Sequence, residues 1–334
     1  MRDRILHLAL IVEPPEAPLT AGPASGAVEF GVSDRWSLTL ETSEEHAVIT
    51  TLAAEPTANP SSRNDQLALE GADAFRRDGC LLLDGVLDAA FVERLHSSYY
   101  ERHAESGSTG HPRRSLRVGH QRYMITIRLQ PPFTESHLYG NPVLLRVLTE
   151  LLGPERVLFS FGAVVSYPGA EDQHVHRDGA GLFGDPAAEG GLPPYAITAI
   201  VPLVEMNAET GTTRVWPGSH RLPDKELQGA ELVDPLVRRG SVLLMDYRLH
   251  HGGLANRSTK PRPILSLVFT RPWFRDAVNF EAQPPLLYNS RERLEMPAEL
   301  RQLLVPAIEE RAEHGATSRA RAFVANAKRR LRGS

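Results

Sequence analysis

Cysteine is almost absent from this chain: Cys80 is the only one in 334 residues, so no disulfide bond can form within it. A chain without disulfides is typical of a reducing compartment, and we expect the protein in the cytoplasm. No run of about 18 consecutive apolar residues is present, so we expect neither a transmembrane helix nor a membrane partner. The formal net charge is only −4, whereas nucleic-acid-binding domains carry basic surfaces, so nucleic acid is not an expected partner.

Hydrophobic residues make up 41% of the chain, enough for a sizeable core, and their pattern predicts three parts. In residues 1–62, linkers rich in Pro, Ala, Gly and Ser flank two alternating runs, 36–40 and 47–52, which predict a small β-hairpin. An oligomer could form through this N-terminal extension. Residues 63–280 are expected to form the main domain, with helices at its start. Residues 281–334 are expected to form a helical segment packed on or beside it.

Short β-like runs dominate the main domain after residue 157. Six of them lie between residues 157 and 270, separated by turns rich in glycine and proline. Helices are expected only earlier, over 67–77, from Asp88 to about 104, and from Asn141 to about 153. Many short strands of this kind favour a sandwich or barrel over a parallel α/β sheet. The sequence therefore predicts a mainly β fold with flanking helices.

A candidate metal site begins with His176 and Asp178, which are two residues apart. In an extended strand the side chains alternate between faces, so these two side chains point the same way, together with His174. Both can therefore reach one metal ion. A lone His-x-Asp pair arises readily by chance, and an edge strand with solvated polar residues would explain it equally well.

A second cluster, further along the chain, makes the metal site a specific hypothesis. The apolar run 240–246 leads into His250 and His251, and Arg262 lies eleven residues after His251. Two imidazoles and one carboxylate suit Fe(II) and leave other positions open for a cosubstrate and oxygen. An arginine nearby could clamp the far carboxylate of a bidentate oxoacid. The combination predicts an oxygenase that uses iron and 2-oxoglutarate.

The order of these motifs resembles that of the phytanoyl-CoA dioxygenase family of Fe(II)/2-oxoglutarate-dependent oxygenases, over about residues 65–274. The resemblance rests on four further motifs: Pro-Gly at 168–169, Pro-Gly-Ser-His at 217–220, Asp-x-Arg-x-x-His at 246–251 and Arg-Pro-Trp-Phe at 271–274. It implies a double-stranded β-helix core of the jelly-roll, cupin-like type. A metal-binding cupin with another function fits less well, because residues 180–183 lack the expected glutamate.

By position, the resemblance implies that His176, Asp178 and His251 bind the iron and that Arg262 binds the 5-carboxylate of 2-oxoglutarate. His250 competes with His251 for the ligand role, but the spacing to Arg262 fits His251, and His250 is then expected in the pocket. Weaker candidates are Ser266, Thr213 and Gln173 for cosubstrate binding, and Arg128, Trp216 and His174 for substrate or pocket contacts.

The resemblance also implies the reaction. Fe(II), 2-oxoglutarate and O2 would oxidise, most simply hydroxylate, a small organic molecule, with succinate and CO2 as coproducts and ascorbate as the reductant in vitro. Secondary metabolism is a candidate context. Asp178 disfavours halogenation, because a small residue replaces this carboxylate in the related halogenases. Other outcomes stay open: desaturation, epoxidation or cyclisation by the same kind of enzyme, a non-catalytic metal-binding jelly roll, and a zinc hydrolase that uses the same ligands.

Overall fold

The computed structural model describes residues 49–53, 60–103, 115–179, 181–183, 186–223, 227, 231–276 and 278–304. Most of the predicted hairpin in residues 1–62 lies outside these ranges, as do residues 305–334 of the predicted C-terminal segment. The described end of the hairpin region, strand β1 (Thr51–Ala53), pairs in parallel with β2 (Cys80–Asp84). It therefore forms one edge of the main sheet.

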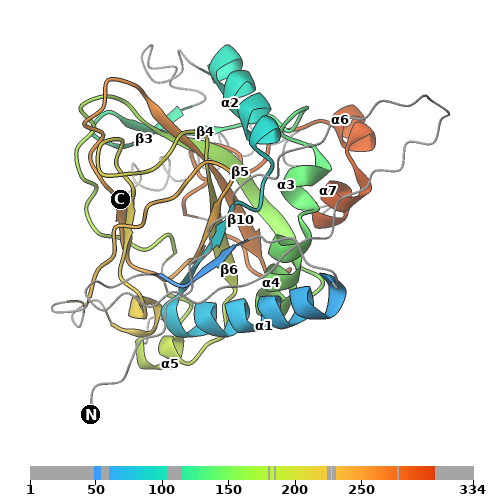
Figure 1. The fold of residues 1–334 in the computed structure, drawn as a ribbon, viewed down its shortest axis with the longest axis vertical. Coiled ribbons are helices and arrows are strands. Elements are labelled where there is room, and N and C mark those ends of the chain that lie inside the picture. The colour runs from blue at the N-terminus through green and yellow to red at the C-terminus, as the bar shows by residue number, and fades with distance from the viewer. Residues whose placement is uncertain are drawn as a thin grey trace, which may run out of the picture.

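The larger layer is an eight-stranded sheet in the order β1-β2-β8-β6-β10-β5-β4-β3 (Figure 1). Every neighbouring pair in it is antiparallel except β1 and β2. Its remaining strands are β3 (Ser115–Gly119), β4 (Arg122–Thr126), β5 (Val157–Ser166), β6 (Ala196–Pro202), β8 (Val242–Asp246) and β10 (Arg262–Thr270).

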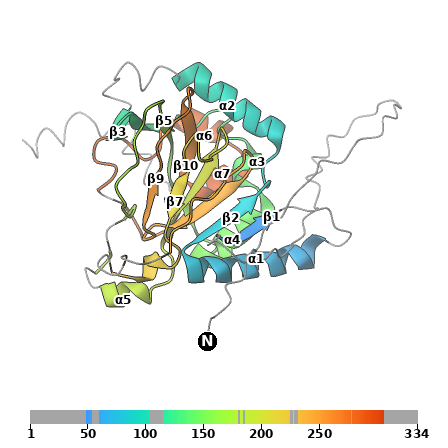
Figure 2. The same cartoon turned by 60° about the vertical axis from the view of Figure 1, so that its left-hand side comes forward.

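The smaller layer is built on β7 (Thr213–Val215) and β9 (His251–Gly253), which Figure 2 shows next to each other. Single bridges add a segment on each side, His176 to His251 and Val215 to Val233. From β5 to β10 the chain passes back and forth between β5, β6, β8 and β10 in the large sheet and these four segments in the small one, with β7 and the Val233 segment following each other in the small sheet. This path is that of a double-stranded β-helix, so the predicted mainly β, jelly-roll fold is confirmed.

Helices cover one face of the large sheet, as Figure 1 shows for α3, α4 and α7. Their apolar side chains form one core with the sheet residues that point toward them. The predicted caps are present, because Asp88 accepts from the N–H of Phe91 (2.9 Å) and Asn141 from that of Leu144 (3.0 Å). The helices are α1 (Pro60–Asp78), α2 (Ala89–His103), α3 (Ser136–Tyr139), α4 (Pro142–Leu152), α5 (Pro186–Gly190), the 3-10 turn η1 (Ser219–Arg221), α6 (Ser290–Glu295) and α7 (Ala298–Leu303).

Strand β10 shows how the sheet separates core from site. Its odd-numbered residues Leu265, Leu267 and Phe269 belong to the core under the helices. Its even-numbered residues face a cavity between the two layers, and they are Arg262, Ile264, Ser266 and Val268. The alternation of side chains along a strand is the cause. One face of this sheet therefore stabilises the fold while the other supplies the cavity.

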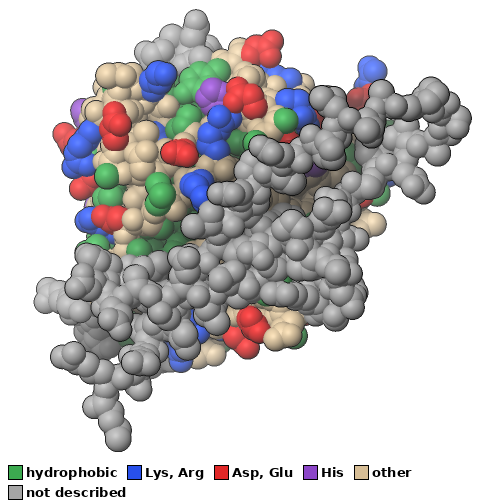
Figure 3. Space-filling view, in the orientation of Figure 1, with side chains coloured by type: hydrophobic (Ala, Val, Ile, Leu, Met, Phe, Trp, Pro, Cys, Tyr) green, Lys and Arg blue, Asp and Glu red, His purple; other side chains and the backbone are tan. Residues whose placement is uncertain are grey.

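The surface agrees with the small net charge. On the face in Figure 3, acidic and basic side chains of the described residues are interspersed. Among the described residues, no helix has the length and apolar character needed to cross a membrane.

Candidate active site

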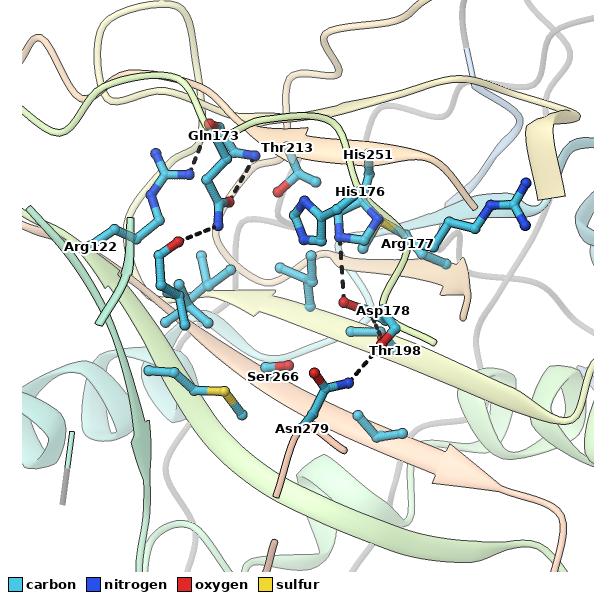
Figure 4. Close-up of a pocket in the computed structure, with 18 of the residues that line it drawn as sticks. Arg122, Gln173, His176, Arg177, Asp178, Thr198, Thr213, His251, Ser266 and Asn279 are labelled. Carbon is cyan, nitrogen blue, oxygen red and sulfur yellow. Dashed lines mark hydrogen bonds and ion pairs between the residues drawn. The ribbon is translucent and has the colours of Figure 1, made fainter. Parts of the chain in front are cut away.

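His176, Asp178 and His251 lie together at one end of the cavity (Figure 4). The main chains of His176 and His251 exchange two hydrogen bonds, of 3.0 and 2.9 Å, which brings β9 alongside the His-x-Asp segment. One ligand atom from each of the three residues lies within 4.8 Å of the other two. Nε2 of His251 is 3.6 Å from Oδ1 of Asp178. A single metal ion could therefore contact all three side chains.

Both imidazoles are oriented by the main chain. Nδ1 of His176 is 3.0 Å from the carbonyl oxygen of His174, and Nδ1 of His251 is 3.0 Å from that of Leu249. A carbonyl oxygen only accepts, so each Nδ1 carries the hydrogen and each Nε2 keeps its lone pair for a metal. Burial lowers the pKa of His176, and the neighbouring His251 lowers it further, which favours the neutral form that binds metals.

The carboxylate of Asp178 is held by residues that sequence reasoning missed. The hydroxyl of Thr198, on β6, donates to Oδ2 of Asp178 at 2.6 Å. The amide nitrogen of Asn279, which follows β10, donates to the main-chain oxygen of Asp178 at 2.6 Å. Neither residue belongs to a motif, and both lie far from Asp178 in the sequence. Because Thr198 bonds Oδ2, Oδ1 is the carboxylate oxygen of Asp178 that lies nearest His251.

The whole cavity has a volume of about 350 Å³, and it contains two buried arginines, Arg262 on β10 and Arg122 on β4. Each is only 1% exposed. Arg262 donates to the hydroxyl of Ser166 (2.7 Å) and to the carbonyl of Gly211 (3.2 Å). Arg122 donates to the carbonyls of Gly253 and Leu254, both at 2.8 Å. Among the described residues, neither guanidinium forms an ion pair with a carboxylate.

Burying these two guanidinium groups in the charged form, without a carboxylate partner among the described residues, costs free energy. Burial, with Arg122 nearby, lowers the pKa of Arg262 to about 9, and burial lowers the pKa of Arg122 to about 10. Nε of each has no hydrogen-bond partner. Uncompensated buried charge is strongly unfavourable unless a counter-charge is supplied. An anionic ligand in the cavity would supply it, so these residues fit the distal carboxylate of a dicarboxylic cosubstrate.

Comparison with known proteins identifies the family. Residues 75–264, more than half of the chain, match the family described as Phytanoyl-CoA dioxygenase (PhyH). The chain belongs to the phytanoyl-CoA dioxygenase family. The resemblance seen in the sequence is thereby confirmed, and the chain is an enzyme of the iron- and 2-oxoglutarate-dependent dioxygenase class.

Curated relatives and a solved structure are similar to part of the chain. Dioxygenase trt7 of Aspergillus terreus (strain NIH 2624 / FGSC A1156) is 25% identical over 207 residues, 58% of this chain and 70% of the relative. The Fe(II)/2-oxoglutarate-dependent dioxygenase nvfF of Aspergillus novofumigatus (strain IBT 16806) is 29% identical over 222 residues, 59% and 71% respectively. The crystal structure of the non-heme alpha ketoglutarate dependent epimerase SnoN from nogalamycin biosynthesis is 23% identical. It covers 68% of this chain and 97% of its own, with a TM-score of 0.48.

Most of the residues predicted for this dioxygenase site line the cavity. The side-chain amide of Gln173 already forms two hydrogen bonds within the protein. It donates to the carbonyl of Val118 and accepts from the N–H of Gly253, both at 3.0 Å. Gln173 therefore joins β3 to β9. In Figure 4, Thr213 lies between Arg122 and Gln173 on one side and the two histidines on the other. The predicted residues in the cavity are Gln173, His174, His176, Asp178, Thr213, His251, Arg262 and Ser266.

Three predicted pocket residues lie elsewhere. His250 points away from the cavity because neighbouring residues face opposite ways in a strand, and its Nε2 accepts from Nε of Arg177 at 3.1 Å. His251, the next residue, faces the cavity instead. Trp216, which directly follows β7, is not among the cavity residues. Arg128 forms an ion pair with Glu292 of α6, at 2.6 and 2.8 Å. The structure therefore does not bring His250, Trp216 and Arg128 to the cavity with the other predicted residues.

The Arg128–Glu292 ion pair should stabilise the fold and leave the cavity unaffected. Its side chains are 36% and 21% exposed, so solvent weakens the attraction, although the pairing is bidentate. We expect Arg128→Met to lower the free energy of unfolding by about 1 kcal/mol. Urea unfolding would measure the change, and calorimetry should find unchanged binding of 2-oxoglutarate. Weaker 2-oxoglutarate binding would instead show that Arg128 influences the cavity.

Proposed function

We propose that this dioxygenase hydroxylates a small organic molecule, with Fe(II) held by His176, Asp178 and His251 and 2-oxoglutarate held by Arg262. One observation carries the proposal: a single cavity contains three convergent metal-ligand atoms and two buried arginines that have no carboxylate partner in the described part of the chain. When bound, Fe(II) and 2-oxoglutarate supply the oxidising chemistry with O2, and succinate and CO2 leave as coproducts.

The protein's part is binding and orientation. The carbonyls of His174 and Leu249 hold the two imidazoles so that Nε2 points to the metal. Arg262 would pair with the 5-carboxylate of 2-oxoglutarate in a region shielded from water, where such a pair is strong. Arg122 would add a second positive charge on the same side. The hydroxyls of Ser266 and Thr213, both in the cavity, are our candidates for further hydrogen bonds to the cosubstrate.

We propose that the substrate presents an apolar part to the metal. Several cavity residues that are not assigned to the metal or the cosubstrate are apolar. They include Leu116 and Val118 on β3, Met124 on β4, Val268 on β10, and Phe280. Phe280 is fixed against Phe159, with ring centroids 5.4 Å apart. Pockets of this kind bind by apolar contact and use few polar groups for orientation. The same walls would exclude water from the reacting carbon.

The test is a succinate assay with Fe(II), 2-oxoglutarate, ascorbate and O2 over a panel of apolar small molecules. We expect one or more compounds to stimulate succinate release and to gain one oxygen atom as an alcohol, as judged by mass spectrometry and NMR. Loss of two hydrogens would replace hydroxylation by desaturation or ring closure, and an epoxide would be recognised by NMR. Hydrolysis supported by Zn(II), or tight ligand binding with no succinate from any compound, would overturn the proposal.

A further inference from the structure

We infer that Thr198 is a positioning residue that makes Asp178 bind the metal through one oxygen, Oδ1. The inference rests on the proposed metal site. Its hydroxyl is 2.6 Å from Oδ2 of Asp178, and an ionised carboxylate can only accept, so Thr198 donates this hydrogen bond. A charge-assisted bond of this length restrains Oδ2 strongly.

The surroundings of Thr198 explain why its hydroxyl is committed to Asp178. Thr198 is 4% exposed on the cavity face of β6. Its register partners on the two neighbouring strands are Met245 of β8 and Val268 of β10, both apolar. A hydroxyl buried between apolar side chains is costly unless it forms a hydrogen bond. Asp178 is the acceptor that it reaches.

Packing alone would not orient Asp178. Its side chain is 26% exposed, so the carboxylate has room to rotate. The hydrogen bond from Thr198 to Oδ2 limits this rotation, and Asn279, which donates to the main-chain oxygen of Asp178, restrains the backbone of the same residue (Figure 4). Oδ1 is left 3.6 Å from Nε2 of His251, on the side where the metal ligands converge.

Coordination through one oxygen matters because carboxylates can also bind metals through both. With one carboxylate oxygen and two imidazoles as ligands, a metal that favours six ligands would keep room for a bidentate oxoacid and for oxygen. A carboxylate bound through both oxygens would take up part of that room. The hydroxyl of Thr198 therefore keeps the site able to take cosubstrate and oxygen together.

The experiment compares Thr198→Val, which removes the hydroxyl at nearly constant shape, with Thr198→Ser, which keeps it. Thr270→Val is the matched control, because the hydroxyl of Thr270 is fully buried on β10 and has no hydrogen-bond partner among the residues that the structure describes. Calorimetry with Co(II) measures metal affinity in the purified full chain. We expect Thr198→Val to bind Co(II) roughly 10–100-fold more weakly than wild type, the range typical for loss of an outer hydrogen bond to a metal ligand. Thr198→Ser and Thr270→Val should stay near wild type.

A second measurement separates positioning from a general loss of stability. At saturating Fe(II) without oxygen, the visible charge-transfer band formed with 2-oxoglutarate should be shifted or weakened in Thr198→Val and restored in Thr198→Ser. Wild-type Co(II) affinity and an unchanged band in Thr198→Val would overturn the inference, as would an equal loss of Co(II) affinity in Thr270→Val. If wild-type protein itself bound no Co(II) or Fe(II), the proposed metal site would fail, and the inference with it.

Discussion

Arg262→Met protein is expected to keep its fold and its metal site but to lose most of its affinity for 2-oxoglutarate. Removing one partner of a buried ion pair costs about 3–5 kcal/mol. This corresponds to a roughly 100- to 3,000-fold weaker affinity, since about 1.4 kcal/mol is a factor of ten. Methionine has a long unbranched side chain that can follow the same path without the charge. Calorimetry on metal-loaded protein, with and without the substitution, would measure the loss.

The same substitution should not destabilise the cosubstrate-free protein. Burial lowers the pKa of Arg262 from 12.5 to about 9, so below pH 9 the folded state carries a charge that is better solvated in the unfolded chain. Removing this charge at neutral pH should offset the lost bonds to Ser166 and Gly211. We therefore expect the melting temperature of Arg262→Met to be no lower than that of wild type, while only wild type is stabilised by 2-oxoglutarate.

Arg128→Met is the natural control for Arg262→Met, because the two changes should affect different properties. Arg128→Met should weaken the fold and leave 2-oxoglutarate binding intact, whereas Arg262→Met should weaken 2-oxoglutarate binding and leave the fold no less stable. In wild type, affinity for 2-oxoglutarate should also decrease as the pH rises through about 9, where free Arg262 loses its proton. Full cosubstrate affinity in Arg262→Met would contradict the assignment and make Arg122, the other buried arginine, the next residue to test.

Asp178→Ala protein is expected to lose metal binding and, with it, all succinate formation. Asp178 is the only anionic residue among the three candidate ligands, and without it two neutral imidazoles would face a divalent cation. The loss should exceed the roughly 10–100-fold typical for an outer hydrogen bond to a ligand. Calorimetry with Co(II), and the absence of the Fe(II)–2-oxoglutarate charge-transfer band, would measure it.

Asp172→Ala is the matched control for Asp178→Ala. Asp172 precedes the same segment but is exposed, and its carboxylate accepts from the N–H of Ala255 at 2.6 Å, outside the metal site. This variant should bind Co(II) as wild type does. If Asp178→Ala kept full metal affinity, a different third ligand would be required. His174, whose ring centroid is 5.4 Å from that of His176, would then be the residue to replace.

The family, and the convergence of His176, Asp178 and His251 in one candidate site, could be predicted from the sequence because their signals are local. His176 and Asp178 share a face through the two-residue period of a strand, and the spacing from His251 to Arg262 spans one turn and one strand. The jelly-roll class likewise followed from short strands between Gly/Pro turns. Such features depend on neighbouring residues in the chain, so they are visible before the chain is folded.

Only the tertiary structure could show which side chains reach the cavity through contacts between segments that are distant in the sequence. Arg128 looked like a substrate anchor until Glu292, 164 residues away, was seen to pair with it. Arg122 and Thr198 reach the cavity only because the sheet sets β4 beside β5, and β6 between β8 and β10. Strand register brings His251 next to His176 and turns His250 away. Pairing between strands is set by the packing of the whole core, which no single segment of sequence encodes.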